Sequence, residues 1–193
     1  MAQPINEKKF RSIPYYVPAK NIATQLSTAS DKRNVSMLKF IWIKLRNWLL
    51  QGLAYNCPVN SIRIQLHRWR GVTIGKGVML GMHCILDNAH PEFIVMEDYT
   101  ALAGNNYVIT HSNPYLHYKW RLLSYLAPVI IRKGAWVGVS ATLLPGTELG
   151  ECSVVSAGSV ASGKIPPNVI ACGNPAVVIR EFKGNDDIFS CYK

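Results

Sequence analysis

The side chains best suited to chemistry in this sequence are one histidine, His111, and an acid–amide pair, Asp87 and Asn88. An imidazole gains and loses a proton near neutral pH, so it can act as a general base towards a hydroxyl group. The carboxylate of Asp87 can orient that ring, and the amide of Asn88 can hydrogen-bond the hydroxyl. The alternative is that His111 is a surface or structural histidine, and that Asp87 and Asn88 are a pair suited to turn geometry.

Groups so far apart in sequence need a regular element to bring them together, and residues 131–166 indicate which one. This stretch divides into six hexads, of which five begin with an aliphatic residue and the sixth with alanine. A small or β-branched residue stands two places before each of these openers. The openers are Ile131, Val137, Leu143, Leu149, Val155 and Ala161, and the residues two places before them are Val129, Ala135, Ala141, Thr147, Ser153 and Ser159.

A period of six fits neither an amphipathic helix nor an alternating strand, and a fixed period indicates a repeat architecture. If each hexad is a short strand plus a corner, three hexads form one triangular coil of roughly 18 residues. Openers of successive coils then stack, with Val137 over Val155. Glycine after an opener, as at Gly138, permits close approach of two backbones. The sequence therefore predicts a mainly β protein built as a parallel β-helix.

The coils begin at Ile74, and the β-helix domain is predicted to span residues 71–181, with a tail at 182–193. The register slips at residues 88–91, which are expected to bulge at a corner. After His111 the repeat stops until Val129, so residues 111–128 form an insertion, and long insertions at corners often build binding faces. His111 is expected to point outward at that corner, with Asp87 and Asn88 one coil earlier.

Positive charge is concentrated before the repeats. Residues 1–70 contain 12 Lys and Arg against 2 acids, whereas residues 71–193 contain 9 of each. Residues 1–33 are expected to form an irregular arm, and residues 34–70 a basic amphipathic helical leader with a second helix ending near Gly71. The leader carries too many charges to span a bilayer. It either caps the open end of the β-helix or lies on the cytoplasmic membrane surface, and both can hold.

The remaining composition narrows the class of protein. The five cysteines are odd in number and form no C-x-x-C pair, which argues against a disulfide framework or a structural zinc site. Residues 1–30 lack the apolar segment of a signal peptide, so we expect a cytoplasmic protein, with peripheral contact at the inner membrane face through the leader. No glycine-rich nucleotide-binding loop is present, and we expect no nucleic acid partner.

Residues 71–181 resemble the hexapeptide-repeat acyltransferases, and the run from Asp87 to His111 is most similar to members that O-acetylate sugars during polysaccharide assembly. The motifs that carry the resemblance are Ala135-Trp136-Val137-Gly138, Leu144-Pro145-Gly146, Ser156-Ala157-Gly158-Ser159-Val160, Ile165-Pro166-Pro167 and Gly173-Asn174-Pro175-Ala176. The resemblance implies a left-handed β-helix, a homotrimer with active sites between subunits, and acetyl-CoA as acyl donor without a metal.

By this resemblance, an acetyl group moves to a hydroxyl of a saccharide or a lipid-linked glycan, with His111 as general base. A backbone N–H near Gly138 and Val139 would face the developing oxyanion. The donor-binding residues implied are Trp136 against the pantetheine arm, Ala157 as a close amide, Lys164 and Arg180 for the phosphates, and Asn174 and Pro175 in the turn along the cleft.

Three alternatives stay open. The acceptor can be an amine, on a nucleotide-sugar or on serine. A zinc hydratase of the same β-helix class would need three histidines, for which His83, His111 and His117 are the candidates. A non-catalytic scaffold would form trimers without binding CoA.

Overall fold

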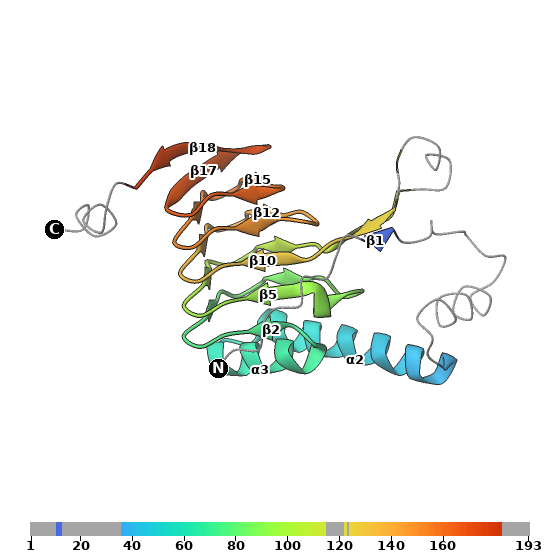
Figure 1. Ribbon diagram of the computed structural model, residues 1–193. Helices are drawn as coiled ribbons and strands as arrows, with labels where there is room; N and C mark the ends of the chain where they lie inside the picture. The colour runs from blue at the N-terminus through green and yellow to red at the C-terminus, as the bar shows by residue number, and fades with distance from the viewer. Residues whose placement is uncertain (1–10, 13–35, 115–121, 123, 183–193) are drawn as a thin grey trace.

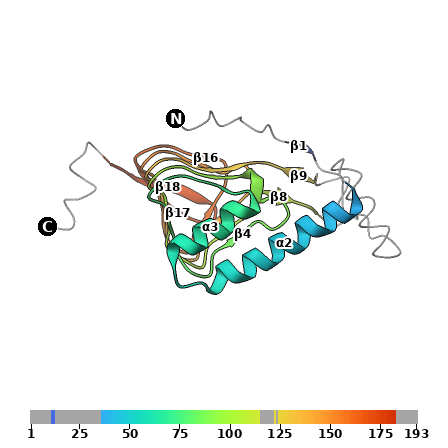
Figure 2. The same ribbon diagram turned by 90° about the horizontal axis from the view of Figure 1, so that it is seen from below.

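The computed structural model describes residues 11–12, 36–114, 122 and 124–182. Its main body is a parallel β-helix, in which short strands stack on three sides of a triangular prism (Figure 1). Two helices lie across one end of the prism, and a small antiparallel sheet projects from one corner (Figure 2).

The strands of each side alternate along the chain. The first side consists of β2 (Thr73–Ile74), β5 (Ile94–Met96), β10 (Val129–Ile131), β13 (Glu148–Leu149) and β16 (Lys164–Ile165). The second consists of β3 (Met79–Leu80), β6 (Ala101–Leu102), β11 (Trp136–Val137), β14 (Val154–Val155), β17 (Val169–Gly173) and the antiparallel β18 (Ala176–Glu181). The third consists of β4 (Ile85–Leu86), β7 (Tyr107–Val108), β12 (Thr142–Leu143) and β15 (Val160–Ala161).

The hexad openers form the core, as predicted. Val137 pairs in register with Val155, and both side chains are fully buried. The small residues two places earlier are also buried, at the corners. Where they are polar, they bond locally: Thr147 Oγ1 donates to the Leu144 carbonyl (2.6 Å), and Ser153 Oγ donates to the Gly150 carbonyl (2.8 Å). Small side chains are therefore required because the corner leaves no space for larger ones.

The register slip and the insertion both occur at the corner between the third and first sides. The slip contains the 3-10 turn η1 (Pro91–Phe93), which precedes β5. The insertion begins with β8 (His111–Ser112), which pairs antiparallel with β9 (Tyr125–Leu126), and β9 pairs with β1 (Arg11–Ser12). Apart from β1, the predicted arm at residues 1–33 lies outside the described residues, as does the tail from residue 183.

Helices α2 (Met37–Asn56) and α3 (Asn60–Arg70) cap the open end of the β-helix, and polar side chains make the cap. Arginine and amide groups, buried except for Arg68, donate to backbone carbonyls that the first coil leaves unpaired, because no further strand follows on that side. On the first side Arg68 donates to Ile74 and Gly75 (2.9 Å each), on the second Arg63 donates to Leu80 (2.8 and 2.6 Å), and on the third Gln51 donates to Cys84 (3.0 Å) and Arg70 to Leu86 (2.8 Å).

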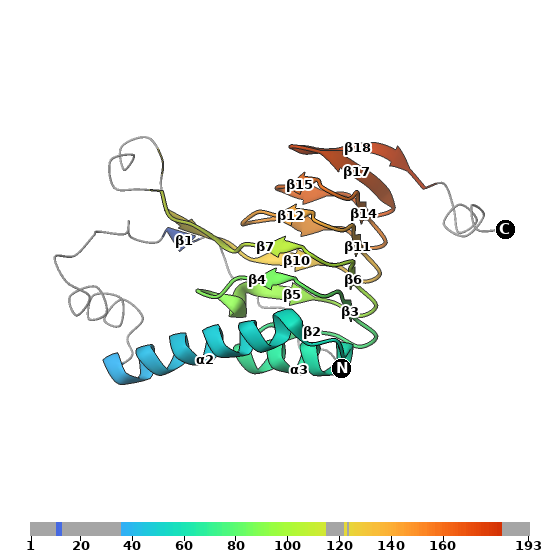
Figure 3. The same ribbon diagram turned by 180° about the vertical axis from the view of Figure 1, so that it is seen from behind.

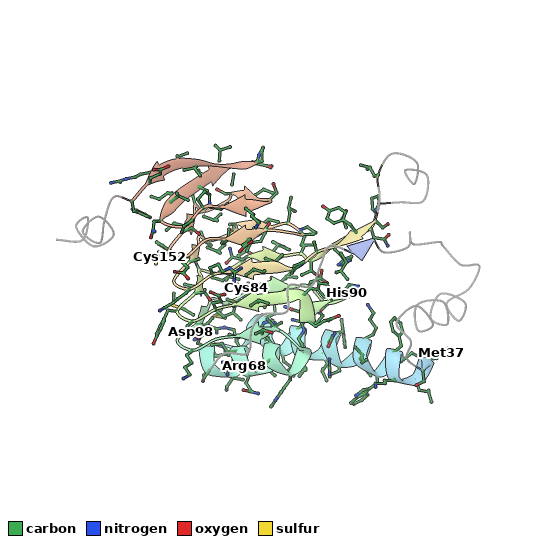
Figure 4. All side chains as sticks on the ribbon, in the orientation of Figure 1. Met37, Arg68, Cys84, His90, Asp98 and Cys152 are labelled. Carbon is green, nitrogen blue, oxygen red and sulfur yellow. The ribbon has the colours of Figure 1, made fainter. Side chains whose placement is uncertain are left out.

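The apolar stripe of α2 faces away from the prism. Phe40, Asn47, Gln51 and Ala54 are buried, whereas the large apolar side chains on the opposite side of the helix are exposed. The exposed stripe, here called the outer stripe, is Leu38 (81% exposed), Trp42 (64%), Leu45 (51%), Leu49 (52%) and Leu53 (54%). Figure 4 shows side chains of α2 projecting away from the β-helix. Among the described residues, no helix is long and apolar enough to cross a membrane.

Candidate active site

The third–first corner brings His111 and Asp87 into contact. Asp87 follows β4 and His111 begins β8, one coil further on, so the two residues meet on the same edge of the prism. Asp87 Oδ2 lies 2.6 Å from His111 Nδ1. The Asp87 side chain is 2% exposed and that of His111 31% exposed, so the carboxylate is enclosed while the ring still reaches solvent.

Asp87 is held in its ionised form by its hydrogen bonds. Its Oδ1 accepts from the backbone N–H groups of Ala89 (2.7 Å) and His90 (3.1 Å). Its Oδ2 accepts from the backbone N–H of Thr110 (2.9 Å) and from Thr110 Oγ1 (2.8 Å), besides His111. Burial by itself raises the pKa of this carboxyl, but the bonds from His111 and Thr110 outweigh burial and hold the pKa well below its usual value.

The charge of Asp87 fixes the tautomer of His111. A carboxylate only accepts hydrogen bonds, so Nδ1 of the ring must carry the proton that it shares with Asp87. Nε2 of the neutral ring then carries the lone pair, and it has no hydrogen-bond partner within the described part of the chain. The His90 ring stands edge-on to that of His111, with 5.7 Å between centroids. This geometry is what a general base requires.

The structure turns Asn88 towards the helical cap instead of towards His111. Its Oδ1 accepts from Arg70 Nη2 (2.6 Å), and its backbone carbonyl accepts from Asn47 Nδ2 (3.2 Å). Its Nδ2 has no partner among the described residues, so one donor of this exposed side chain is available to a ligand. Asn88, the third catalytic candidate from the sequence, thus lies beside the His111–Asp87 pair without a hydrogen bond to the His111 ring.

Arg70 is a residue at this corner that sequence reasoning missed. It is 1% exposed, and its Nη2 donates to the carbonyls of Leu86 (2.8 Å) and Asp87 (2.9 Å) as well as to Asn88. Its Nη1 contacts Gln51 Oε1 (2.5 Å). Burial lowers the pKa of Arg70 to about 10, which leaves the guanidinium protonated at neutral pH. The only sequence signal was its place in the last turn of a helix, next to the Gly71 stop.

Four of the predicted donor-binding residues line one groove on the second side. Trp136, Gly138, Val139 and Ala157 enclose a hollow of about 410 Å³, together with Ala103, Val154, Val155, Ser156 and Ile170. A Cβ on Gly138 would stand 2.5 Å from the Ala157 nitrogen, so only glycine allows this approach. The backbone N–H groups of Val139 and Ala157 donate to no acceptor within the described residues.

The other predicted donor-binding residues surround this groove less closely. Arg180 lies on β18 and pairs with Ile170, which lines the groove. Asn174 and Pro175 form the turn between β17 and β18, joined by a cis peptide bond. Lys164 lies on the first side, where its Nζ is 3.3 Å from Glu148 Oε2 and its side chain is 85% exposed. The structure therefore does not bring Lys164 into the groove.

The histidines proposed for zinc do not meet within the described residues. His83 lies at the corner between the second and third sides, where its ring stacks obliquely on Tyr55 (4.9 Å), away from the corner that holds His111. His117 lies outside the described residues. The described part of the chain contains no group of three metal-ligating side chains. Cys57, Cys84, Cys152 and Cys172 are unpaired, and Cys191 is not described.

Comparison with curated proteins identifies the family. No protein-family model matches the chain. A Staphylococcus aureus (strain COL) protein described as an acetyltransferase is 32% identical over 167 residues, which are 84% of this chain and 78% of that protein. The chain belongs to the hexapeptide-repeat acetyltransferases. Escherichia coli K12 galactoside O-acetyltransferase is 35% identical over 101 residues, 48% of this acetyltransferase and 49% of its own length. The chain spans about half the length of the curated relatives it matches first.

Solved structures support the fold of this hexapeptide-repeat acetyltransferase. The acetyl-CoA complex of a hexapeptide-repeat acetyltransferase from Vibrio cholerae O1 biovar eltor has a TM-score of 0.62 at 20% identity and covers 76% of this chain and 90% of its own. Maltose O-acetyltransferase from Clostridium difficile 630 has a TM-score of 0.60 at 23% identity, and the match covers 75% of this chain and 88% of the maltose enzyme. The expected left-handed parallel β-helix is thereby confirmed.

Proposed function

We propose that this protein transfers the acetyl group of acetyl-CoA to a saccharide hydroxyl, with His111 as general base. The observation that carries the proposal is the 2.6 Å contact of His111 Nδ1 with the buried Asp87 carboxylate, which leaves Nε2 as the basic nitrogen. The galactoside and maltose O-acetyltransferases among its relatives and structural neighbours favour a sugar acceptor, as in the synthesis of a surface polysaccharide.

The residues present fit acetyl-CoA as the donor. The groove on the second side has apolar walls from Trp136 and Ile170, which suit the methylene groups of a pantetheine arm. The unpaired N–H groups of Val139 and Ala157 suit its amide carbonyls or the thioester oxygen. When bound, the donor supplies an acetyl thioester whose carbonyl carbon is open to attack. Arg180, beside this groove, is the candidate for the phosphates, and Asn174 and Pro175 shape its rim.

The reaction needs one base and one oxyanion donor. His111 Nε2 takes the proton of the acceptor hydroxyl as its oxygen bonds to the carbonyl carbon, and the negative charge of Asp87 stabilises the imidazolium formed. The N–H of Val139 donates to the carbonyl oxygen while it carries negative charge. As the carbon–sulfur bond breaks, His111 returns the proton to the departing sulfur. The products are the acetyl ester and the CoA thiol, and the enzyme is unchanged.

This site is completed by a second copy of the chain. In a triangular prism the third–first corner, which holds His111, lies opposite the second side, which holds the groove (Figure 3). One protomer therefore presents its base to the groove of a neighbour, and a closed ring of three protomers gives each groove one base. Sedimentation velocity tests this: we expect a trimer, and a monomer with full activity would refute it.

The outer stripe is proposed to contact an anionic membrane surface. It exposes Trp42 and four leucines, and residues 36–70 contain six Lys and Arg and no acid. A second copy docked on the same face would oppose two positive surfaces, so charge favours anionic lipid. Trp42→Ser with Leu45→Ser should abolish cosedimentation with phosphatidylglycerol vesicles. Val177→Ser with Ile179→Ser, which removes exposed apolar groups from β18, should not. Equal binding by all variants, or concentration-dependent doubling of mass through this face, would refute the contact.

Thiol release from acetyl-CoA in the presence of a panel of saccharides tests the activity. Wild-type protein should release thiol with at least one sugar, and the His111→Ala variant should be slower by about 10²–10⁴-fold. The variant should still fold, with a small loss of stability, and its affinity for CoA should be unchanged. If the variant kept most of its activity, His111 would not be the base. If only amines such as serine were acetylated, the acceptor would be nitrogen, as in the N-acetyltransferase alternative.

A further inference from the structure

A second hollow lies beside the His111 corner, between α2 and the third side of the prism. It has a volume of about 240 Å³ and is lined by Trp48, Gln51, Gly52, Tyr55, Asn56, Ile85 and Asn88. Ile85 belongs to β4, whose other residue, Leu86, is fully buried in the core, so the hollow lies on the outer face of that strand. Figure 3 shows α2 running below β4 on this side.

One flank of α2 supplies most of the wall. Trp48, Gly52 and Tyr55 are four and three residues apart, so successive residues stand on the same flank of the helix. Gly52 has no atom within 4 Å of where a Cβ would be, so it leaves the wall open between the two rings. Trp42, six residues before Trp48, points about 120° away, into the outer stripe.

The floor of the hollow at Asn88 adjoins the base. Asn88 follows Asp87 directly, and Asp87 holds His111. Arg70 donates to Oδ1 of the Asn88 side chain and thereby orients the amide. Its Nδ2 is a donor in a defined position, without a partner in the described residues. The side-chain amide of Asn56 and the Tyr55 hydroxyl, which also line the hollow, form no side-chain hydrogen bond within the described residues. The hollow thus combines two aromatic rings with at least three unengaged polar groups.

We propose that this hollow binds a sugar ring of the acceptor, next to the unit that is acetylated. A sugar ring offers apolar C–H faces, which pack on Trp48 and Tyr55, and hydroxyl groups, which pair with amides and a phenol. The hollow is smaller than usual for a drug-sized ligand, about 300 Å³ or more, which suits one ring of a longer chain. This inference rests on the proposed function, because it assigns the acceptor of the same site.

The test compares a short acceptor with a longer one. Methyl β-galactoside, maltose and maltotetraose are the probes, with kcat/KM measured by thiol release. In the wild-type protein the longer acceptors should be favoured, and Trp48→Ala should raise their KM by about tenfold. The KM for acetyl-CoA and the kcat should change little. Tyr55→Phe and Asn56→Ala should each raise the same KM by a smaller factor.

Trp42→Ala is the matched control, because Trp42 and Trp48 lie on the same helix and are 64% and 67% exposed. If both alanine variants changed acceptor KM alike, or neither did, the subsite would be refuted. If the wild-type protein acetylated no saccharide, the proposed function would fail instead. Calorimetric titration of maltotetraose would then decide the subsite alone: binding that Trp48→Ala removes and Trp42→Ala keeps supports it, and no binding overturns it.

Discussion

Replacement of Asp87 with asparagine separates the catalytic interpretation of the His111 corner from the turn interpretation. The substitution keeps size and shape, but it removes the charge and turns one acceptor oxygen into an NH2 donor. The Asp87 carboxylate accepts five hydrogen bonds, from Ala89 N, His90 N, Thr110 N, Thr110 Oγ1 and His111 Nδ1. If the NH2 group of the asparagine takes the place of Oδ1, it faces the N–H groups of Ala89 and His90. If it takes the place of Oδ2, it faces the Thr110 N–H and the His111 ring, so at least two donors lose their acceptor in either case.

The magnitude follows from those contacts. Each buried donor that loses its acceptor costs about 1–3 kcal/mol, so Asp87→Asn should lower the free energy of unfolding by about 2–6 kcal/mol. If NH2 faces His111, the ring shifts its proton to Nε2 and can no longer act as base. If NH2 faces Ala89, the ring keeps its tautomer but loses the charge that stabilises the imidazolium. Both outcomes lower kcat, by about 10²–10⁴-fold.

Urea unfolding and thiol release measure the two effects separately. His111→Ala is the control, since it removes one of the five bonds: it should lose activity with a smaller loss of stability. An Asp87→Asn protein that is destabilised but retains kcat would refute the reasoning, and would leave Asp87 as a turn residue only.

The pH dependence of stability provides a second measurement on the same residue. Because hydrogen bonds hold the pKa of Asp87 below its usual value, its contribution to stability is present above the pKa of the unfolded chain, about 3.9, and is lost as the pH falls further. Wild-type protein should therefore lose stability below about pH 4 more steeply than the Asp87→Asn variant. Parallel curves would show that the carboxylate is not stabilised by its partners.

Three further outcomes are expected. Val139→Pro removes the unpaired N–H in the groove on the second side and should lower kcat by about 10²–10³-fold with folding intact, as measured by thiol release and circular dichroism. Burial and the neighbouring Arg70 and Arg63 lower the pKa of His67 to about 3. Stability should therefore fall by up to about 1.4 kcal/mol per pH unit below about pH 6.5, and His67→Gln should flatten that slope in urea titrations. Arg70→Lys replaces the forked guanidinium with a single ammonium, which cannot keep both the Nη1 contact with Gln51 and the Nη2 bonds to Leu86, Asp87 and Asn88. It should lower both the unfolding free energy, by about 2–4 kcal/mol, and kcat.

The β-helix could be predicted because its core consists of single residues that recur at a fixed spacing in the sequence. Val137 must stack on Val155 once the hexads are coiled, and the fully buried pair follows. The same stacking places Trp136, Gly138 and Ala157 side by side in two neighbouring coils, but their assignment to the acyl donor came from the resemblance to the family. Lys164 was harder to place, because the repeat shortens between Ala161 and Ile165, and that change moves later residues onto other sides of the prism.

The cap was one of the two roles expected for the leader, but the face of the helix that makes it could not be derived from the pattern. An apolar stripe normally marks the packing face of a helix, but the surface that α2 meets is the open end of the first coil, where backbone carbonyls need donors. Polar groups such as Gln51 and Asn47 are therefore the buried ones. The hydrogen bond of Arg70 to the Asp87 carbonyl could not be predicted either. The two residues are 17 positions apart, one on a helix and one on the β-helix, and the hexad spacing says nothing about how these elements lie relative to each other.

The cap is compatible with the membrane contact proposed for the same leader. Arg63 and Arg68 bond to neutral carbonyls, not to carboxylates, so their charges are used for capping without being neutralised, whereas the charge of Arg70 also interacts with the Asp87 carboxylate. Their positive field persists at the end of the prism where the outer stripe is exposed, and no acid in residues 36–70 offsets it. The capping and membrane-facing interpretations of the leader are therefore compatible: the polar face closes the β-helix, and its charge makes the opposite face suited to anionic lipid.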